Sequence, residues 1–227
     1  MAIRAVTFDV DGTLFDLRQM KVVFAISALR HARFLRAFLK AREEVRALGA
    51  VEDVRREQDE RVAKALGIPV EKAAALRRKV IDEEWVACFA KVKPIPGARE
   101  ALARLREMGL KLGTVSDYEA APKLTRMKLD HVAWDADVGA EPLNALKPHP
   151  RAFAEAVSRL GFAPEEVLHV GDRLDADVAG AHAAGMKAAL FTAGNAKRWE
   201  APAGARAPEL VFDDYRALVA ALEGGLG

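Results

Sequence analysis

The stretch Ile3-Arg4-Ala5-Val6-Thr7-Phe8-Asp9-Val10-Asp11-Gly12-Thr13 begins as a short apolar run and ends on two carboxylates one residue apart. A run of this length is typical of a strand that is buried on both faces of a parallel sheet. Residues i and i+2 of an extended backbone point to the same side, so Asp9 and Asp11 can act together. The segment is also compatible with a strand followed by a polar turn. Polar residues farther along the chain decide between the two interpretations.

The sequence pattern changes after this strand and again near residue 93. From Asp16 to Val92, apolar residues recur at spacings of three and four, which predicts three or four helices with breaks at Gly49 and Gly67. The proline pair in Lys93-Pro94-Ile95-Pro96-Gly97 disfavours helix and predicts the end of this helical part. We therefore expect two domains, one formed by residues 1–15 and 93–227 and one formed by residues 16–92.

Segments of helical and strand pattern alternate beyond residue 97. Helices are expected at 98–108, from about 122, at 151–160, 175–184 and 215–222, and strands at 110–115, 136–138, 167–170, 188–191 and 210–212. This alternation predicts an α/β fold, a doubly wound parallel sheet with right-handed crossovers. The first strand belongs to the same sheet, so the helical part is an insertion between strands one and two.

The composition excludes several classes of protein. The 227 residues are 51% hydrophobic and carry a net charge of +2, so no nucleic acid or acidic membrane is expected as a partner. A single cysteine, Cys88, excludes an internal disulfide and a cysteine-based zinc site. The chain shows no membrane-spanning apolar run and begins directly with a strand, so we expect a cytoplasmic protein. It could be a monomer or a homodimer.

Polar residues follow each of the first four strands of the expected sheet. They are Asp9 and Asp11, then Ser116 and Asp117, then Lys147, and finally Gly171-Asp172 with Asp177. Ligands of open parallel sheets bind at this edge, beyond the carboxyl ends of the strands. Crowded carboxylates repel unless a cation lies among them, and an all-oxygen site suits Mg²⁺ better than zinc. Lys147 can hold a phosphate dianion, so the pattern predicts a phosphoryl-transfer centre. Taken singly, Ser116 could instead cap a turn and Lys147 could be solvated.

With these motifs in this order, the chain resembles the haloacid dehalogenase superfamily. The resemblance covers nearly the whole length and is specific to the phosphatase branch with an α-helical cap inserted after the first motif, which includes phosphoglycolate phosphatase-like proteins. It implies a Rossmann-like core, a helical cap at 16–92 and a Mg²⁺ cofactor. The stretch from Asp135 to Leu146 departs from the loop pattern common in the family, which leaves the third strand the least certain.

The resemblance also implies a role for each motif residue. Asp9 is expected to be the nucleophile that forms an aspartyl-phosphate, and Asp11 to protonate the leaving oxygen and then activate water. The expected phosphate-binding residues are Gly12, Thr13, Ser116, Asp117 and Lys147, with Asp117 equally compatible with a hydrogen bond inside its loop. The expected metal ligands are the carboxylates of Asp9 and Asp172, the main-chain carbonyl of Asp11, and Asp177 through water or by orienting the others.

The first part of the insertion is strongly basic. Residues 16–42 contain seven Lys and Arg side chains against one acid, Asp16. Arg18 and Lys21 lie closest in sequence to the first motif, so they are candidates for recognising an anionic leaving group. For the set as a whole, a solvated helix face paired with acids such as Glu57 and Glu60 is favoured instead.

The expected function is Mg²⁺-dependent hydrolysis of a small-molecule phosphate ester. A phosphomutase also keeps both aspartates of the first motif, so the motifs alone do not exclude it. A 2-haloacid dehalogenase or a phosphonate hydrolase usually lacks an acid at the position of Asp11. A non-catalytic binding protein on the same fold would be expected to have lost one of these groups.

Overall fold

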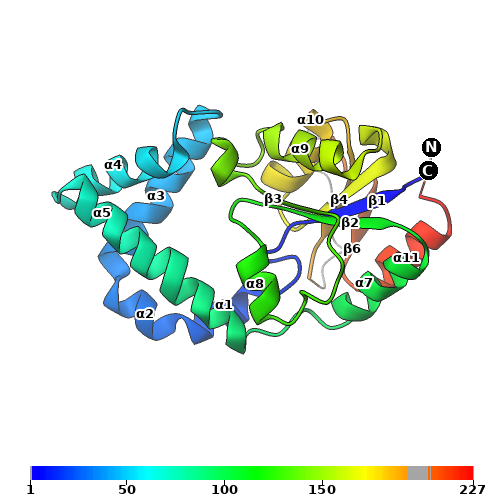
Figure 1. Ribbon diagram of the computed structural model, residues 1–227, viewed down its shortest axis with the longest axis horizontal. Helices are drawn as coiled ribbons and strands as arrows, with labels where there is room; N and C mark the ends of the chain where they lie inside the picture. The colour runs from blue at the N-terminus through cyan, green and yellow to red at the C-terminus, as the bar shows by residue number, and fades with distance from the viewer. Residues whose placement is uncertain (1, 194–203, 205, 227) are drawn as a thin grey trace.

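The structure is a computed structural model that describes residues 2–193, 204 and 206–226. Its centre is a six-stranded sheet in which all neighbours run parallel, in the order β3-β2-β1-β4-β5-β6 (Figure 1). The strands are β1 Ala5–Phe8, β2 Lys111–Ser116, β3 Ala136–Gly139, β4 Val167–Gly171, β5 Lys187–Phe191 and β6 Leu210–Phe212. β2 and β3 lie on one side of β1, and β4, β5 and β6 lie on its other side. The strand order therefore reverses at β1, where open α/β sheets bind ligands.

Helices cover both faces of the sheet. They are α7 Ala98–Glu107, α8 Ala121–Arg126, α9 Arg151–Leu160, α10 Ala179–Ala183 and α11 Tyr215–Glu223, with short 3₁₀ turns at Glu141–Leu143 and Pro164–Glu166. Val6 packs in one apolar cluster with Leu102 of α7 and Leu218 of α11. Its neighbour Ala5 belongs to a second cluster with Phe153 of α9. Successive residues of β1 thus face opposite layers, as expected for a strand that is buried on both sides.

The helices of residues 16–92, which lie between β1 and α7, form a separate layer beyond the carboxyl edge of the sheet (Figure 1). They are α1 Leu17–Val23, α2 Ala25–Arg30, α3 Ala32–Leu48, α4 Val54–Leu66, α5 Val70–Arg77, a π-helix at Arg78–Trp85, α6 Val86–Cys88 and a 3₁₀ turn at Phe89–Lys91. We call residues 16–92 the insertion. Its two connections run side by side, because Phe15 bridges to Pro94 and the Ile95 N–H donates to the Leu14 carbonyl at 2.9 Å.

The expected elements are present, and two details differ. Gly49 and Gly67 end α3 and α4 as expected, but further breaks occur at Phe24 and His31. Neither is a helix-breaking residue, so the pattern predicted fewer helices. The helix expected at 175–184 begins as a π-helix, Leu174–Val178, before α10. The least certain strand, β3, lies where it was expected.

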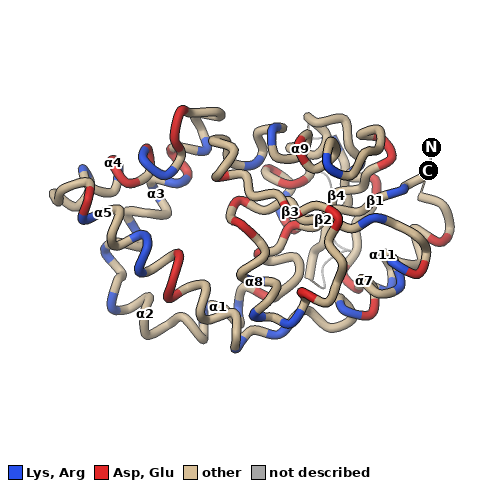
Figure 2. Tube along the Cα trace, in the orientation of Figure 1, with Lys and Arg blue, Asp and Glu red and all other residues tan. Residues whose placement is uncertain are grey.

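Charged residues of both signs are interspersed along the insertion and the sheet layer (Figure 2). The acids Glu57 and Glu60, expected to pair with the basic start of the insertion, instead pair with Arg61 and Arg56 of their own helix. Side chains four residues apart share one helix face, so these local pairs form readily. Among the described residues, no helix combines the length and apolarity that a membrane crossing requires.

Candidate active site

Three adjacent strands bring the sequence motifs to one edge. Asp9 directly follows β1, and its N–H donates to the Val170 carbonyl of β4 at 2.8 Å, extending the parallel ladder. Ser116 ends β2 on one side of β1, and Asp172 follows the last residue of β4 on the other. The motifs predicted to meet are therefore neighbours because of strand order and register.

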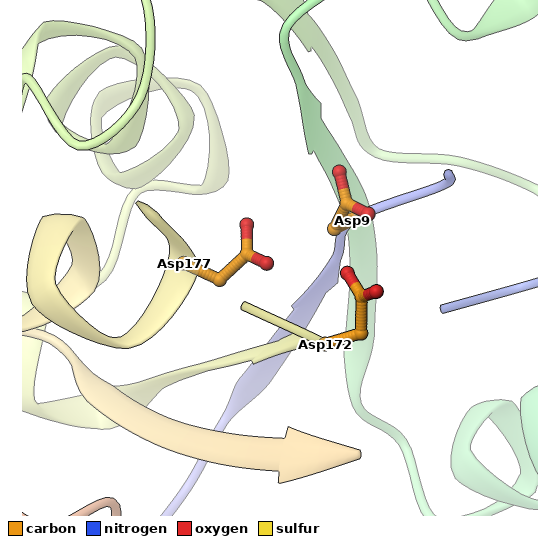
Figure 3. A group of neighbouring side chains, drawn as sticks. All are labelled: Asp9, Asp172 and Asp177. Atoms are coloured by element: carbon orange, nitrogen blue, oxygen red, sulfur yellow. The ribbon is translucent and has the colours of Figure 1, made fainter. Parts of the chain in front are cut away.

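Three carboxylates converge at this edge. Asp9, Asp172 and Asp177 each offer an oxygen, and these atoms lie within 4.8 Å of one another (Figure 3). Two glycines make this crowding possible. A Cβ at Gly12, whose φ is +96°, would lie 2.3 Å from Asp172 Oδ2, and a Cβ at Gly171 would lie 2.3 Å from the Asp177 side chain. Any other residue at either position would push the carboxylates apart.

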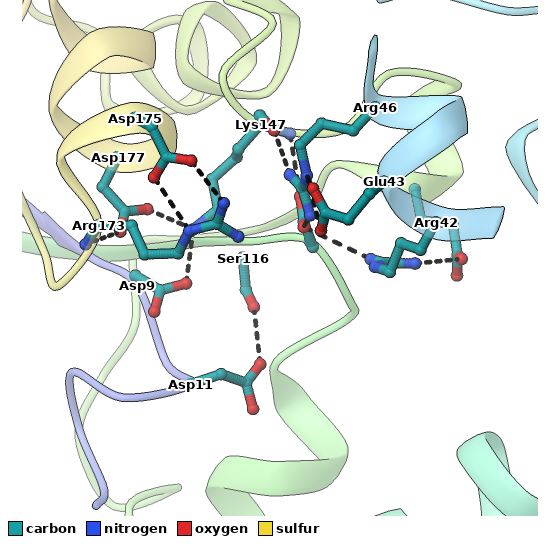
Figure 4. Close-up of polar contacts among 12 residues, drawn as sticks. Asp9, Asp11, Arg42, Glu43, Arg46, Ser116, Lys147, Arg173, Asp175 and Asp177 are labelled. Carbon is teal, nitrogen blue, oxygen red and sulfur yellow. Dashed lines mark hydrogen bonds and ion pairs between the residues drawn. The ribbon is translucent and has the colours of Figure 1, made fainter. Parts of the chain in front are cut away.

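Lys147 is the cation at the centre of the cluster. Its Nζ donates to Asp9 Oδ1 and to Asp177 Oδ1, both at 2.6 Å, and to the Val115 carbonyl at 3.3 Å (Figure 4). Burial alone would lower the pKa of Lys147, but Asp177 and Asp9 outweigh it and raise that pKa. The lysine therefore carries its charge, and one positive charge faces three carboxylates.

The ionisation of the carboxylates reflects this imbalance. Burial, strengthened by Asp177, raises the pKa of Asp172 to about 6. Burial also raises the pKa of Asp9, although Lys147 opposes the shift. Burial disfavours ionised Asp177 too, but Lys147 and His169 outweigh it and lower its pKa. Two of the three acids thus resist ionisation unless another positive charge is supplied.

The donor set fits a divalent cation. Asp172 Oδ1 is buried and has no hydrogen-bond partner among the described residues, which is costly for a carboxylate oxygen. The oxygens of the cluster are hard ligands of the kind that Mg²⁺ and Ca²⁺ take. Both oxygens of Asp177 already accept hydrogen bonds, from Lys147 Nζ at 2.6 Å and from the Arg173 N–H at 3.0 Å. These contacts favour an orienting role for Asp177.

Asp11 and Thr13 occupy different positions around Asp9. The Asp11 carboxylate lies 3.5 Å from Ser116 Oγ, which donates to it, and it pairs with Lys123. Thr13 is fully buried, and its hydroxyl donates to Asp9 Oδ2 at 3.3 Å. Lys123, on α8, did not emerge from the sequence pattern. Only its short distance in sequence from Ser116 hinted that it belongs to the site.

A cavity of about 460 Å³ lies between the insertion and the sheet edge. Its lining includes all of the charged motif residues, namely Asp9, Asp11, Asp117, Lys147, Asp172 and Asp177, together with Ser116. Arg18 and Lys21 are not among the described residues that line it. Arg18 is exposed and pairs with Asp16, so its role in substrate recognition stays a prediction. The cations that the insertion contributes to the cavity are Arg42 and Arg46 of α3.

These two arginines join the insertion to the loops after β2 and β3. Arg46 Nη2 donates to Asp117 Oδ2 at 2.8 Å, and Nη1 donates to the Lys147 carbonyl. Arg42 Nη1 lies 3.3 Å from Glu141 Oε1, and its guanidinium stacks 4.0 Å from the ring centre of Tyr118. Asp117 also accepts from the Lys147 N–H at 2.9 Å, so its carboxylate is held by the loop after β3 and by α3.

Comparison with known proteins identifies a family and similar sequences. The model of the family "haloacid dehalogenase-like hydrolase" matches residues 3–185. A glyceraldehyde 3-phosphate phosphatase from Methanopyrus kandleri is 36% identical to the chain over 96% of both sequences. A phosphoglycolate phosphatase from Haemophilus influenzae is 33% identical over 56% of both.

Solved structures share the fold. An L-2-haloacid dehalogenase from Xanthobacter autotrophicus superimposes with a TM-score of 0.71 at 24% identity, covering 98% of this chain and 99% of the other. A HAD phosphatase from Thermococcus onnurineus gives a TM-score of 0.64 at 22% identity, covering 99% and 100%. At these identities the likeness establishes the architecture, and the chemistry rests on the site residues.

Proposed function

Because the chain belongs to the haloacid dehalogenase-like hydrolase family, we propose that it hydrolyses small-molecule phosphomonoesters through an aspartyl-phosphate on Asp9. One observation carries this proposal. Asp9 is held by Lys147 at 2.6 Å, while a second acid, Asp11, faces the same cavity. A nucleophile and an acid–base group that share one pocket are the parts that a two-step displacement needs.

In the first step, an oxygen of Asp9 attacks the phosphorus of the ester. The bond from phosphorus to the leaving oxygen breaks, and that oxygen takes a proton from the Asp11 carboxyl group. Lys147 and the Ser116 hydroxyl stabilise the charge on the transferred phosphoryl group, as fixed donors do in a water-excluded site. The Thr13 hydroxyl, 3.3 Å from Asp9 Oδ2, keeps the nucleophile oriented.

In the second step, water attacks the phosphorus of the aspartyl-phosphate. Asp11, now a carboxylate, accepts the proton of that water, and the bond from phosphorus to the Asp9 oxygen breaks. Phosphate leaves, Asp9 is again a carboxylate, and Asp11 is protonated for the next turnover. Because one group serves as acid and then as base, Asp11 must stay within reach of both the leaving oxygen and the water.

A magnesium ion would be held by Asp9 and Asp172, with Asp177 orienting them and the Asp11 carbonyl as a further ligand. When bound, it supplies positive charge beside the phosphoryl oxygens and relieves the repulsion among the acids. We further propose that the insertion, residues 16–92, is a cap that excludes water from the cavity and contacts the leaving group.

Phosphate release from a panel of metabolite phosphomonoesters tests the proposal. We expect Mg²⁺-dependent release that stops when the metal is chelated. A parallel assay follows chloride release from 2-chloropropionate, which carries no phosphate and whose hydrolysis would proceed without metal. Turnover of the haloacid, or phosphate release that persists without divalent metal, would replace the phosphatase mechanism with dehalogenase-like chemistry. Transfer of the phosphoryl group to a second hydroxyl of the substrate would indicate a mutase.

A further inference from the structure

The part of the cavity that faces the acidic cluster is largely apolar. The insertion contributes Phe24, Leu35, Phe38, Ile81 and Trp85 to the lining. Leu17 and Leu39 also line it and are 40% and 61% exposed, so the apolar wall reaches the surface. A site that recognises a sugar or a polyol needs several convergent hydrogen-bonding groups, and among the described residues the insertion supplies only three charged side chains, all on α3.

The cations of the cavity already have acidic partners. Arg46 pairs with Asp117 at 2.8 Å and with Glu43 at 3.1 Å, and Arg173 pairs with Asp175 at 2.7 Å. Lys147 donates to the carboxylates of Asp9 and Asp177. A carboxylate on the leaving group would therefore find no uncommitted cation among the described lining residues. It would also approach the acids Glu43 and Asp117, and like charges in a confined site are unfavourable.

Arg42 offers a single hydrogen bond. Its side chain is buried, with Nη1 on Gln58 and Glu141. Its Nη2 has no hydrogen-bond partner among the described residues, although Asp117 Oδ2 lies 3.6 Å away. The guanidinium charge is balanced by Glu141 and Asp117. One neutral oxygen of a ligand, such as a hydroxyl or carbonyl, could therefore satisfy Nη2 without bringing a charge.

We propose that the leaving group of the substrate is uncharged and largely apolar, with one oxygen acceptor at most facing Arg42. This inference rests on the proposed phosphatase function and names the substrate class of the same site. A volume of about 460 Å³ falls in the range of roughly 300–1,000 Å³ that is usual for small-molecule sites, so it accommodates more than a two- or three-carbon group. Apolar surface that leaves water on binding supplies the affinity.

Two series of esters measure this selectivity in the presence of Mg²⁺. The first series is propyl, butyl, pentyl and hexyl phosphate, and kcat/KM should rise by about fourfold for each methylene that becomes buried. The second compares phenyl phosphate with 3-carboxyphenyl phosphate, whose leaving groups have similar acidity. The uncharged ester should be preferred by at least about tenfold. By the same reasoning, glyceraldehyde 3-phosphate should be a better substrate than 2-phosphoglycolate.

A matched pair of variants links the selectivity to the cavity. Leu39→Lys introduces a cation at a partly exposed lining position, so it should raise kcat/KM for 3-carboxyphenyl phosphate relative to phenyl phosphate by about tenfold. Leu48→Lys is the control, because Leu48 lies on the same helix, is 55% exposed and is not among the lining residues. It should leave the ratio unchanged.

The outcomes separate the two proposals. If phosphate is released from none of these esters, the proposed function fails and this inference fails with it. If phosphate is released but the carboxylated ester is preferred, or kcat/KM does not respond to chain length, the apolar leaving group is refuted while the phosphatase function stands. If the ratio of kcat/KM for 3-carboxyphenyl phosphate to that for phenyl phosphate shifts equally in Leu39→Lys and Leu48→Lys, the selectivity does not arise in the cavity, and the inference is refuted.

Discussion

Lys123 pairs with the carboxylate of Asp11 although the two residues lie 112 positions apart in the sequence. The lysine side chain is 1% exposed, and its Nζ lies 4.5 Å from the ring centre of Trp85 and 5.0 Å from that of Tyr118. Trp85 belongs to the insertion, whereas Tyr118 follows β2. The position of the proposed acid–base group therefore depends on a cation that is enclosed by aromatic rings from both parts of the structure.

Replacing Lys123 with Met should slow the reaction more than it weakens binding. The change keeps most of the side-chain volume but leaves Asp11 without the cation that holds it. We expect kcat to fall on the order of tenfold to a hundredfold with a nearly constant KM, since misplacement of a proton-transfer group affects the transition state. Arg126→Met, an exposed position of the same helix, is the control. A change in KM alone would show that Lys123 serves substrate binding instead.

Asp9→Asn should abolish turnover and leave the fold intact. The amide is nearly isosteric with the carboxylate but is a poor nucleophile, so no aspartyl-phosphate can form. Steady-state phosphate release and circular dichroism measure the two effects. Asp175→Asn, an exposed acid that pairs with Arg173, is the matched control and should retain activity. Activity near the wild-type level in Asp9→Asn would refute the role of Asp9.

Mg²⁺ should stabilise the folded protein. An ion that binds only the folded state, at about a hundred times its dissociation constant, adds about 2.7 kcal/mol to the free energy of unfolding. We expect Tm to rise on titration with Mg²⁺ and to return on chelation, and the rise to shrink in Asp172→Asn. Thermal unfolding followed by circular dichroism provides the measurement. An equal rise in Tm for the wild type and for Asp172→Asn would mean that Mg²⁺ binds at another site.

The metal-free protein should lose stability as the pH rises toward 6. Burial, with Asp177, raises the pKa of Asp172 from 3.8 to about 6. Between these values the folded state holds a proton that the unfolded state has lost, so the free energy of unfolding falls with rising pH and the penalty is complete above about pH 6. Asp172→Asn removes this penalty, so its stabilising effect should be larger at about pH 7 than at about pH 5.

Urea denaturation of both proteins in the presence of a chelator measures that difference. Comparing the variant with the wild type at each pH cancels other groups that titrate in this range, among them His169, whose pKa is lowered by burial. If the change in the free energy of unfolding caused by Asp172→Asn is the same at both pH values, the raised pKa of Asp172 is contradicted.

Arg46 and Asp117 should be energetically coupled. Their ion pair joins the insertion to the loop after β2, and both side chains are largely buried, at 10% and 14% exposure. We expect the double variant Arg46→Met with Asp117→Asn to be less destabilised than the sum of the single variants, by about 0.5–3 kcal/mol. Arg36→Met, at an exposed position of the same helix, is the control. Additive effects would show that the pair contributes nothing beyond its separate side chains.

The position of the sequence motifs along one edge of the sheet could be predicted because it follows from local patterns. A short apolar run predicts a buried strand, alternation with helices predicts a parallel sheet, and parallel strands place their carboxyl ends along one edge. We expected Asp9, Ser116 and Asp172 to meet, and the structure places them at the carboxyl ends of three adjacent strands. The glycines at positions 12 and 171 belong to the same motifs, and they leave the space that the carboxylates occupy.

The residues that surround the motifs could not be predicted in the same way. Arg42 belongs to a basic stretch that was interpreted as a solvated face, yet it is 4% exposed because Glu141, 99 positions away, balances it. Lys123 likewise lies within a short helix, α8, whose sequence pattern does not show that the lysine pairs with Asp11.

By itself, the sequence determined the succession of strands and helices along the chain, the acidic edge and the insertion after β1, because hydrophobic periodicity and turn residues act over a few positions of the chain. The order of the strands across the sheet came from the structure. Only the tertiary structure decided which charged side chains of the helices are buried and what the cavity offers to a leaving group. A cation can be buried only where a distant segment supplies its partner, and that partnership is a property of the packing of segments rather than of any one of them.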